Sequence, residues 1–300
     1  KFMADRLTGI EITNHEGLVD LIEPLMHANH SAKSAIDGAL HDLIGKHLKK
    51  PMYDLLGGKK RLNAPMFWMI AGSKDEMELA KARIDDGYIA FKVKVGMNLP
   101  EHDLVRSEQS RKICGNGVHV SADANQGYSP PNAIKFAKGA GDAGLDFFEQ
   151  PVNGHDIESM KNCAAVCSVP IAADEGIHSI EDIQKHYDQK AAMGGSLKLI
   201  KLGSASGVME GAKLMQKLSM SVNLAGKTAD TSIGSAAISH LAVSLPTLEW
   251  DASVTNQYLA DDVVKNPIQV VNGHIVTPDG PGLGIEVDED KIEKYKRNLQ

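Results

Sequence analysis

Short apolar segments alternate with amphipathic segments along the chain from about residue 63 onward. A short apolar run predicts a buried strand, and apolar residues three or four positions apart predict a helix. Strands are expected at 64–70, 89–96, 118–122, 145–148, 170–173, 196–197, 221–224 and 247–251. Helices are expected at 75–86, 131–141, 179–187, 205–218 and 232–245. This alternation predicts an α/β fold with a parallel sheet.

The number and spacing of the strands favour a closed sheet. Eight strands in units of about 25 residues close as a (β/α)8 barrel more readily than they extend an open sheet. An open doubly wound sheet would also carry a glycine-rich phosphate turn after its first strand, and Ala71-Gly72-Ser73-Lys74 lacks that spacing. The sequence therefore predicts a TIM barrel over residues 63–266.

The region before the barrel, residues 1–62, does not follow the repeat. It predicts a short helix at 17–26 and a longer, clearer helix for which Ser31 is the N-cap and which ends before Pro51. A second short segment, 52–56, ends at two glycines that would cap it.

The tail of the chain, residues 267–300, departs from the repeat as well. It begins with a hairpin around Asn272-Gly273 and continues as an irregular loop at 278–284. We expect this tail to leave the barrel and to pack elsewhere.

Two lysines occupy alternate positions of the strand at 89–96. Successive side chains of a strand point to opposite faces, so Lys92 and Lys94 share one face and Phe91, Val93 and Val95 share the other. If helices cover the apolar face, both ammonium groups point into the barrel, where burial is costly unless anions face them. The alternative is an edge strand whose lysines are solvated.

Carboxylates follow three successive predicted strands: Asp123, Glu149 and Asp174. Together with Lys94 and Lys198 they recur every 24 to 29 residues, so they fall at the carboxyl ends of the strands, where barrel active sites lie. Three unpaired carboxylates there would repel one another, and a divalent cation would relieve the repulsion. Oxygen ligands without His or Cys favour Mg²⁺. The alternative for each acid is a loop carboxylate bound to a helix N-terminus.

Lys94 and Lys198 would flank a substrate that the metal holds. Substrate carboxylate oxygens on Mg²⁺ would acidify the α-carbon by stabilising an enediolate, and a lysine with a lowered pKa could then remove the α-proton. Lys92, a neighbouring like charge, would help to lower that pKa. Each lysine alone could instead be a surface residue.

Composition narrows the choice of partners. A net charge of −7 argues against a nucleic-acid surface. The three cysteines, Cys114, Cys163 and Cys167, lack zinc-site companions and predict core thiols in a reducing cytoplasm. No apolar run reaches the roughly 18 residues of a membrane span, and no signal peptide precedes Lys1. We expect a cytoplasmic homo-oligomer whose partner is a small molecule, and neither a nucleic acid nor a membrane.

The order and spacing of five motifs resemble the muconate lactonizing enzyme subgroup of the enolase superfamily. The motifs are Lys92-Val93-Lys94, Asp123-Ala124-Asn125, Glu149-Gln150-Pro151, Ala173-Asp174-Glu175 and Lys198-Leu199-Ile200-Lys201-Leu202-Gly203. In addition, residues 35–58 resemble the helical part of its capping domain, and 230–234 resemble its Glu-Ser-x-Ile-Gly stretch. The resemblance covers essentially the whole chain.

The resemblance implies a modified TIM barrel of enolase type and a role for each motif. Asp123, Glu149 and Asp174 would bind Mg²⁺, Lys94 and Lys198 would form the acid/base pair, and Lys92 would help electrostatically. Asn125 and Glu175 would support the metal ligands from behind.

The cap is the first departure from the family pattern. Family members begin with a β-meander that closes over the barrel mouth, and no segment before Lys1 corresponds to it. We therefore expect residues 1–62 to form a partial capping domain, to which residues 267–300 return.

The resemblance also implies abstraction of the proton α to a carboxylate. Trp250 and Thr255-Asn256-Gln257-Tyr258 resemble the cis-3-hydroxy-L-proline dehydratases, so our first hypothesis is dehydration of such an acid. The alternatives are a racemase or epimerase of an N-substituted amino acid, proline betaine or dipeptide, and a muconate-type cycloisomerase. An incomplete cap would leave the site open to water, so a non-catalytic barrel is an alternative of another class.

Substrate specificity is predicted at the end of the eighth strand. Asp251 would meet the amine of the substrate, and Trp250 or Tyr258 would form a wall for a pyrrolidinium ring. The alternative is that Trp250 packs under the outer helices and Asp251 caps a turn.

Overall fold

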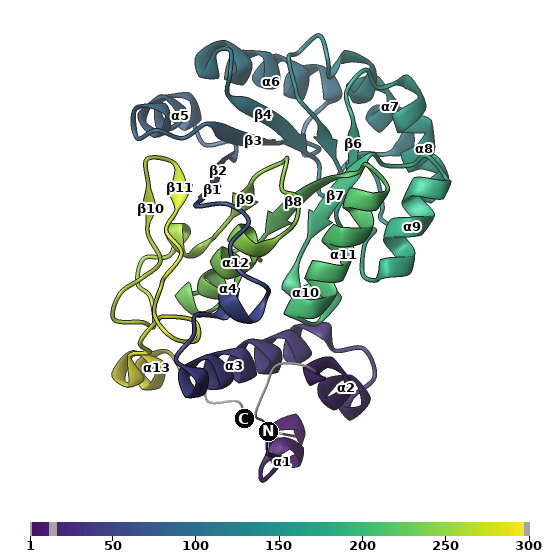
Figure 1. The fold of residues 1–300 in the computed structure, drawn as a ribbon. Helices are drawn as coiled ribbons and strands as arrows, with labels where there is room; N and C mark the ends of the chain where they lie inside the picture. Colours follow the sequence, from purple (N-terminus) through teal and green to yellow (C-terminus); the bar gives the residue numbers. More distant parts are fainter. Residues whose placement is uncertain (1, 12–16, 297–300) are drawn as a thin grey trace.

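The computed structural model describes residues 2–11 and 17–296, and eight parallel strands form its centre (Figure 1). Neighbours in the sheet are also neighbours in the sequence, and a single bridge between Met66 and Ala252 links the first and last strands. The strands are β2 (Phe67–Ile70), β3 (Ala90–Lys94), β4 (His119–Asp123), β5 (Phe148–Glu149), β6 (Ile171–Ala173), β7 (Gly194–Leu197), β8 (Ser221–Ala225) and β9 (Ala252–Ser253). The predicted α/β barrel is confirmed.

Helices surround the strands on the outside of the barrel (Figure 1). They are α5 (Glu76–Asp85), α6 (Pro100–Cys114), α7 (Pro130–Gly139), α8 (Ile157–Val166), α9 (Ile180–Asp188), α10 (Leu199–Leu202), α11 (Ala205–Lys217) and α12 (Ser232–Ser244). Helix α7 shows how they are held: it buries Phe136, whose ring centroid lies 4.6 Å from that of Phe148 on β5. Large apolar side chains therefore fill the layer between strands and helices, and inward-facing positions are free for polar residues.

The base of the barrel, at the amino ends of the strands, is closed by aromatic rings. Trp250 stacks on Phe147 with ring centroids 4.2 Å apart. A Cβ on Gly194 would lie 2.3 Å from the Trp250 ring, so only glycine leaves room for this plug.

The eighth strand is the main correction to the predicted elements. It was expected at 247–251, but β9 begins at Ala252. The reason is that Trp250 turns inward to plug the base, and Asp251 adopts a φ of 60° that reorients the chain before the strand starts.

The N-terminal region is helical, as predicted, and lies beside the barrel (Figure 1). Its elements are α1 (Phe2–Leu7), α2 (Leu18–Ile22), η1 (Glu23–Leu25), α3 (His30–Leu48) and α4 (Met52–Leu55). Asn29, not Ser31, occupies the N-cap position of α3. The Asp37 carboxylate on α3 accepts a hydrogen bond of 2.8 Å from Ala205 N and so ties this helix to α11.

The tail forms the predicted hairpin at Asn272-Gly273. Its strands β10 (Val270–Val271) and β11 (His274–Ile275) make a small sheet with β1 (Ala64–Pro65). The tail then contacts the segment after α3, because Gly282 N donates to Lys50 O at 2.9 Å. The short elements η2 (Asn256–Tyr258) and α13 (Glu289–Tyr295) complete the fold. In the described part of the chain, no helix has both the length and the apolarity needed to cross a membrane.

Candidate active site

A cavity of about 350 Å³ opens at the carboxyl ends of the barrel strands. Its lining includes Lys92 and Lys94 from β3, Lys198 after β7, and the three carboxylates Asp123, Glu149 and Asp174. Period-2 alternation places Lys92 and Lys94 on the same inward face, and Lys94 is paired in register with Asp123, which is paired with Glu149. The sequence-predicted lysines and acids therefore lie in one cavity, and the solvated edge strand is excluded.

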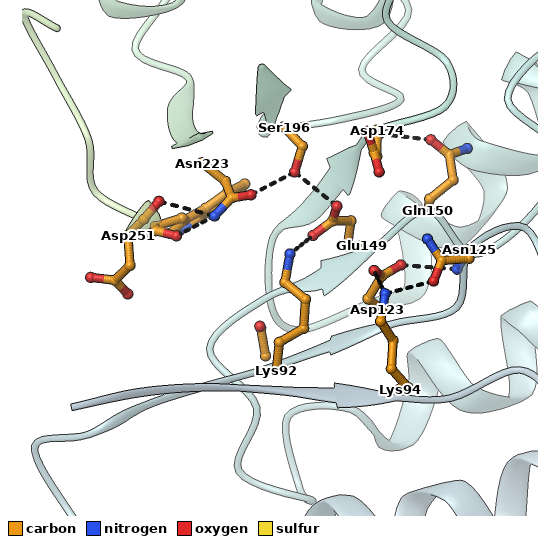
Figure 2. A network of polar contacts seen from close by, with 12 residues as sticks. Lys92, Lys94, Asp123, Asn125, Glu149, Gln150, Asp174, Ser196, Asn223 and Asp251 are labelled. Atoms are coloured by element: carbon orange, nitrogen blue, oxygen red, sulfur yellow. Dashed lines mark hydrogen bonds and ion pairs between the residues drawn. The ribbon is translucent and has the colours of Figure 1, made fainter. Parts of the chain in front are cut away.

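Each of the three carboxylates is ion-paired with a lysine, and Figure 2 shows two of the pairs, Lys92 with Glu149 and Lys94 with Asp123. Lys92 Nζ donates to Glu149 Oε2, and Lys94 Nζ donates to Asp123 Oδ2 at 2.6 Å. Burial requires this pairing, because Glu149 and Asp123 are almost completely enclosed. The inward lysines therefore face anions, as expected, whereas the argument for a divalent cation treated the same carboxylates as unpaired, which they are not.

Asp174 has two cationic partners, one of which the sequence reasoning missed. Lys198 Nζ donates to Asp174 Oδ2 at 2.5 Å, and Lys201 Nζ donates to Asp174 Oδ1 at 2.5 Å. Lys201 also donates to the backbone oxygens of Asp174 and Ser196 at 2.5 and 2.9 Å. The signal was present in the sequence, because Lys201 follows Lys198 by three residues and the helical turn α10 brings both to one side.

The charges of the site set the pKa values of its lysines. Burial opposes the charge on Lys94 and on Lys198, but Asp123 and Asp174 respectively outweigh it and raise both pKa values. In this arrangement neither Lys94 nor Lys198 has the lowered pKa that was predicted for the base. Either lysine can accept a proton only after its carboxylate has been engaged by another cation.

Comparison with known proteins places the chain in a family. Residues 75–291 match the family described as "Enolase C-terminal domain-like", and residues 1–57 match the mandelate racemase / muconate lactonizing enzyme N-terminal domain. Chloromuconate cycloisomerase of Pseudomonas putida is 30% identical over 99% of this chain and 81% of its own length. The chain belongs to the muconate lactonizing enzyme subgroup of the enolase superfamily.

Two further members of the superfamily illustrate its range. L-Ala-D/L-Glu epimerase of Clostridium acetobutylicum is 31% identical over 93% of this chain and 78% of its own. The structure of muconate lactonizing enzyme from Pseudomonas putida superimposes with a TM-score of 0.92 at 28% identity, over 98% of this chain and 83% of that one. The predicted family is confirmed, and the chain is an enzyme of the lyase or isomerase type found in this superfamily.

Enzymes of this subgroup generally depend on a divalent metal. The carboxylate oxygens of Asp123, Glu149 and Asp174 are ligands of the type that such a metal requires. Burial raises the pKa of Glu149, and the nearby charges of Asp123 and Asp174 add to that rise, so the three carboxylates lie close enough to interact. Buried oxygen donors of this type suit a hard divalent cation. Among the described residues, however, no group of three His, Cys, Asp or Glu side chains is arranged to hold a metal ion. Each of the three acids is instead paired with a lysine.

Asn125 and Glu175 lie beside the acids, at the rim of the cavity. Asn125 accepts a hydrogen bond of 2.7 Å from Lys94 Nζ and donates one of 3.0 Å to Glu175 Oε1. Burial raises the pKa of Glu175, and the neighbouring charge of Asp174 adds to the rise. Both side chains are therefore placed where they can orient Lys94.

Asp251 and Trp250 lie at the opposite end of the barrel from the lysines. Asp251 Oδ2 lies 2.9 Å from His119 Nδ1 at the start of β4, and its carboxylate points away from Glu149 (Figure 2). Trp250 is part of the plug at the base. A role for either in binding substrate at the cavity does not fit this placement.

Tyr258 lies nearer to the cavity than Asp251 and Trp250 do, but it is not one of the residues that line the cavity. Its hydroxyl accepts a hydrogen bond of 3.3 Å from Met69 N, and its ring packs on Trp68 with centroids 5.1 Å apart. Met69 does line the cavity, so Tyr258 supports the wall from behind.

Three buried polar residues of the site were not singled out in the sequence. Ser196 and Asn223 extend the contacts of Glu149, and the Gln150 side chain accepts hydrogen bonds from the backbone N–H groups of Asp174 and Gly176 at 2.8 and 3.2 Å. Gln150 has a φ of 37°, which aims its side chain along the strand ends. Only its position directly after Glu149 could have suggested this bracing role.

Proposed function

We propose that this enzyme removes the proton α to the carboxylate of a small substrate, with Lys94 and Lys198 as the acid/base pair. The observation that carries the proposal is the convergence of two lysines on one cavity from β3 and from the end of β7. The strands β4, β5 and β6, which carry or precede the three acids, lie between them. A substrate held at the acids would meet one lysine on each side.

Asp123, Glu149 and Asp174 would hold a Mg²⁺ ion. When bound, such an ion stabilises negative charge that develops on a substrate carboxylate. The residues of the chain supply the remaining functions. Lys92 keeps Glu149 oriented, Lys94 or Lys198 takes the proton after leaving its own carboxylate, and Asn125 with Glu175 guides Lys94 as it moves.

Dehydration of a cis-3-hydroxy-L-proline-like acid is the finer reaction that we propose first. Its remaining support is the Thr255-Asn256-Gln257-Tyr258 resemblance, of which Thr255 lines the cavity. Asp251 and Trp250 no longer contribute to it.

Racemisation or epimerisation is the second candidate. The paired lysines favour it, because moving a proton from one face of the α-carbon to the other needs an acid opposite a base. A relative named as an epimerase also supports it.

The test is α-proton exchange in D₂O. The purified protein with Mg²⁺ is incubated with cis-3-hydroxy-L-proline, an N-succinyl amino acid, L-Ala-L-Glu or muconolactone, and the α-proton signal is followed by ¹H NMR. Exchange with inversion indicates a racemase or epimerase, and loss of the β-hydroxyl indicates a dehydratase. Exchange with none of these substrates would contradict the proposal as stated.

Variants then assign the lysines. Lys94→Ala and Lys198→Ala should each slow exchange by about 10²–10⁴-fold. Lys265→Ala, which removes an exposed lysine paired with Glu286, should leave the rate unchanged. Near-normal exchange in either cavity variant would refute the acid/base assignment.

A further inference from the structure

The backbone of Lys94, the last residue of β3, is held from outside the barrel. The pairing of β3 with β2 ends one residue earlier, at Val93 opposite Ile70. On the other side of the strand, Val95 N donates to Asp123 O at 2.9 Å. A trans peptide directs its N–H and its C=O to opposite sides, so the Lys94 carbonyl faces the β2 side, beyond the last paired residue. This carbonyl therefore has to find its donor outside the sheet.

Arg106 on the outer helix α6 supplies that donor. Its Nη1 group donates to Lys94 O at 2.8 Å and to Asp103 Oδ1 at 3.2 Å. Its Nε and Nη2 groups donate to the two carboxylate oxygens of Glu76 on α5 at 3.0 and 2.9 Å. Four of the five N–H donors are thus engaged, and the planar fork leaves the guanidinium one orientation. The end of β3 is fixed relative to α5 and α6 in consequence.

The buried Asp103 carboxylate attaches the next loop to the same cluster. Its side chain is 0% exposed, and its Oδ2 accepts hydrogen bonds from Gly96 N at 2.8 Å and from the Tyr128 hydroxyl at 2.7 Å. Tyr128 follows Asn125 by three residues in the loop after β4, and the Asn125 side chain accepts from Lys94 Nζ. The backbone of Lys94 and one partner of its ammonium group are therefore anchored together.

We propose that Arg106 is a positioning residue for Lys94. By holding the carbonyl oxygen at the end of β3, it sets the point from which the Lys94 side chain reaches the substrate. Arg106 is not one of the residues that line the cavity, so it acts through Lys94 and not on the substrate. The proposal rests on the proposed function, since it takes Lys94 as one member of the acid/base pair, but it needs no metal ligand. Misplacing a reacting group by about 1 Å can slow a reaction about 10²-fold.

The test variant is Arg106→Lys. It keeps a positive charge near Asp103 and Glu76, but one ammonium group cannot reproduce the fork that contacts both acids and the Lys94 carbonyl. A second variant, Glu76→Gln, loosens the guanidinium from its outer side and leaves Arg106 in place. It provides the test if Arg106→Lys does not fold.

Arg111→Lys is the matched control on the same helix. The Arg111 side chain is 19% exposed, against 18% for Arg106, and it also binds backbone oxygens and a carboxylate. It donates to Val118 O and Gly144 O at 2.6 Å each and to Asp146 Oδ2 at 2.5 Å. Val118 precedes β4, so these contacts lie at the amino end of the barrel, away from the cavity. The two variants therefore remove the same kind of contact at opposite ends of α6.

The experiment measures kcat and KM of α-proton exchange in D₂O, on a substrate that the wild type exchanges, and the Tm of each variant. We expect Arg106→Lys to lower kcat by about 10–10²-fold with KM within about twofold of the wild type. Arg111→Lys should keep both constants within about twofold, although its Tm falls by a similar amount. Glu76→Gln should lower kcat in the same direction, by less.

Three outcomes would overturn the positioning role. The first is the same kcat for Arg106→Lys and Arg111→Lys, or an unchanged kcat for Glu76→Gln if Arg106→Lys does not fold. The second is a raised KM with an unchanged kcat in Arg106→Lys, which would indicate substrate binding. Both leave the proposed function to be decided by Lys94→Ala and Lys198→Ala. The third is a wild-type protein that exchanges the α-proton of no substrate, which would overturn the proposed function and this role with it.

Discussion

Replacing Lys201 tests whether a buried ion pair stabilises the site. Its side chain is 8% exposed, and its ammonium group contacts one carboxylate oxygen and two backbone oxygens. Replacing it by methionine keeps most of the length of the side chain but removes the ammonium group, and with it the charge and all three donors. Among the described residues, Asp174 would keep Lys198 as its only cationic partner.

The size of the loss follows from these contacts. Removing one member of a buried ion pair costs about 3–5 kcal/mol, because it leaves an uncompensated buried charge. The contact of Asp174 with Lys198 reduces that cost, and Asp174 O keeps the hydrogen bond of 2.9 Å from Ile177 N. Loss of the contact with the Ser196 carbonyl oxygen increases the cost by at most about 1–3 kcal/mol unless water replaces the ammonium group. We therefore expect Lys201→Met to lower the free energy of unfolding by about 3–5 kcal/mol. At about 2–4 °C per kcal/mol this is a fall in Tm of about 6–20 °C.

The assay is thermal and urea unfolding followed by circular dichroism, with Lys265→Met as the matched control. Lys265 is ion-paired with Glu286, but both side chains are more than half exposed. Solvent screens such an exposed pair, so the Tm of the control should stay close to that of the wild type. If Lys201→Met lost no more stability than Lys265→Met, the claim that Lys201 compensates a buried charge would be wrong.

Two further predictions concern the base of the barrel. Gly194→Ala should destabilise the protein by about 1–3 kcal/mol in urea unfolding, because its Cβ would meet the indole plug and a backbone oxygen, whereas Gly38→Ala, with open space at its Cβ inside α3, should be neutral or stabilising. Equal effects of the two would contradict the plug. Asp251→Asn should leave KM unchanged and cost under about 1 kcal/mol. The Asp251 hydrogen bond raises the pKa of His119, so that contribution is present below about pH 6.5 and is lost as the pH rises through the folded-state pKa. The loss should be greater at pH 6 than at pH 8, and a changed KM would return Asp251 to the substrate site.

Much of the barrel and its charged centre could be predicted from the sequence, because both depend on short-range periodicity. Alternation along β3 decides that Lys92 and Lys94 face inward together. The regular spacing of strand–helix units decides that Asp123, Glu149 and Asp174 fall at one end of the barrel. Neither inference needs any knowledge of which atoms touch.

The contacts within the site could not be predicted in the same way. That each acid is paired with its own lysine depends on side-chain reach across neighbouring strands, which spacing alone does not fix. Ser196 and Asn223 belong to an apolar and small-residue context in the sequence, and only the barrel interior brings Ser196 to Glu149 on a strand two places away. The contacts of Ser196 and Asn223 in the site can be recognised only when the closed curvature of the sheet is known.

The placement of Asp251 shows how a small shift in a strand boundary reverses a functional interpretation. A strand at 247–251 would put Asp251 at its carboxyl end, among the catalytic groups. Because β9 starts at Ala252, Asp251 instead lies at the amino end, opposite His119 on β4. The hydrophobic pattern could not decide between these two strand boundaries, because the indole of Trp250 would be buried with either of them. The space at Gly194 decides between the two strand boundaries. It accommodates the Trp250 indole at the base of the barrel, so the strand begins only after Asp251. The cavity wall from β9 and the residues just after it is consequently made by Ser253 and Thr255, and the Asp251 carboxylate takes no part in it.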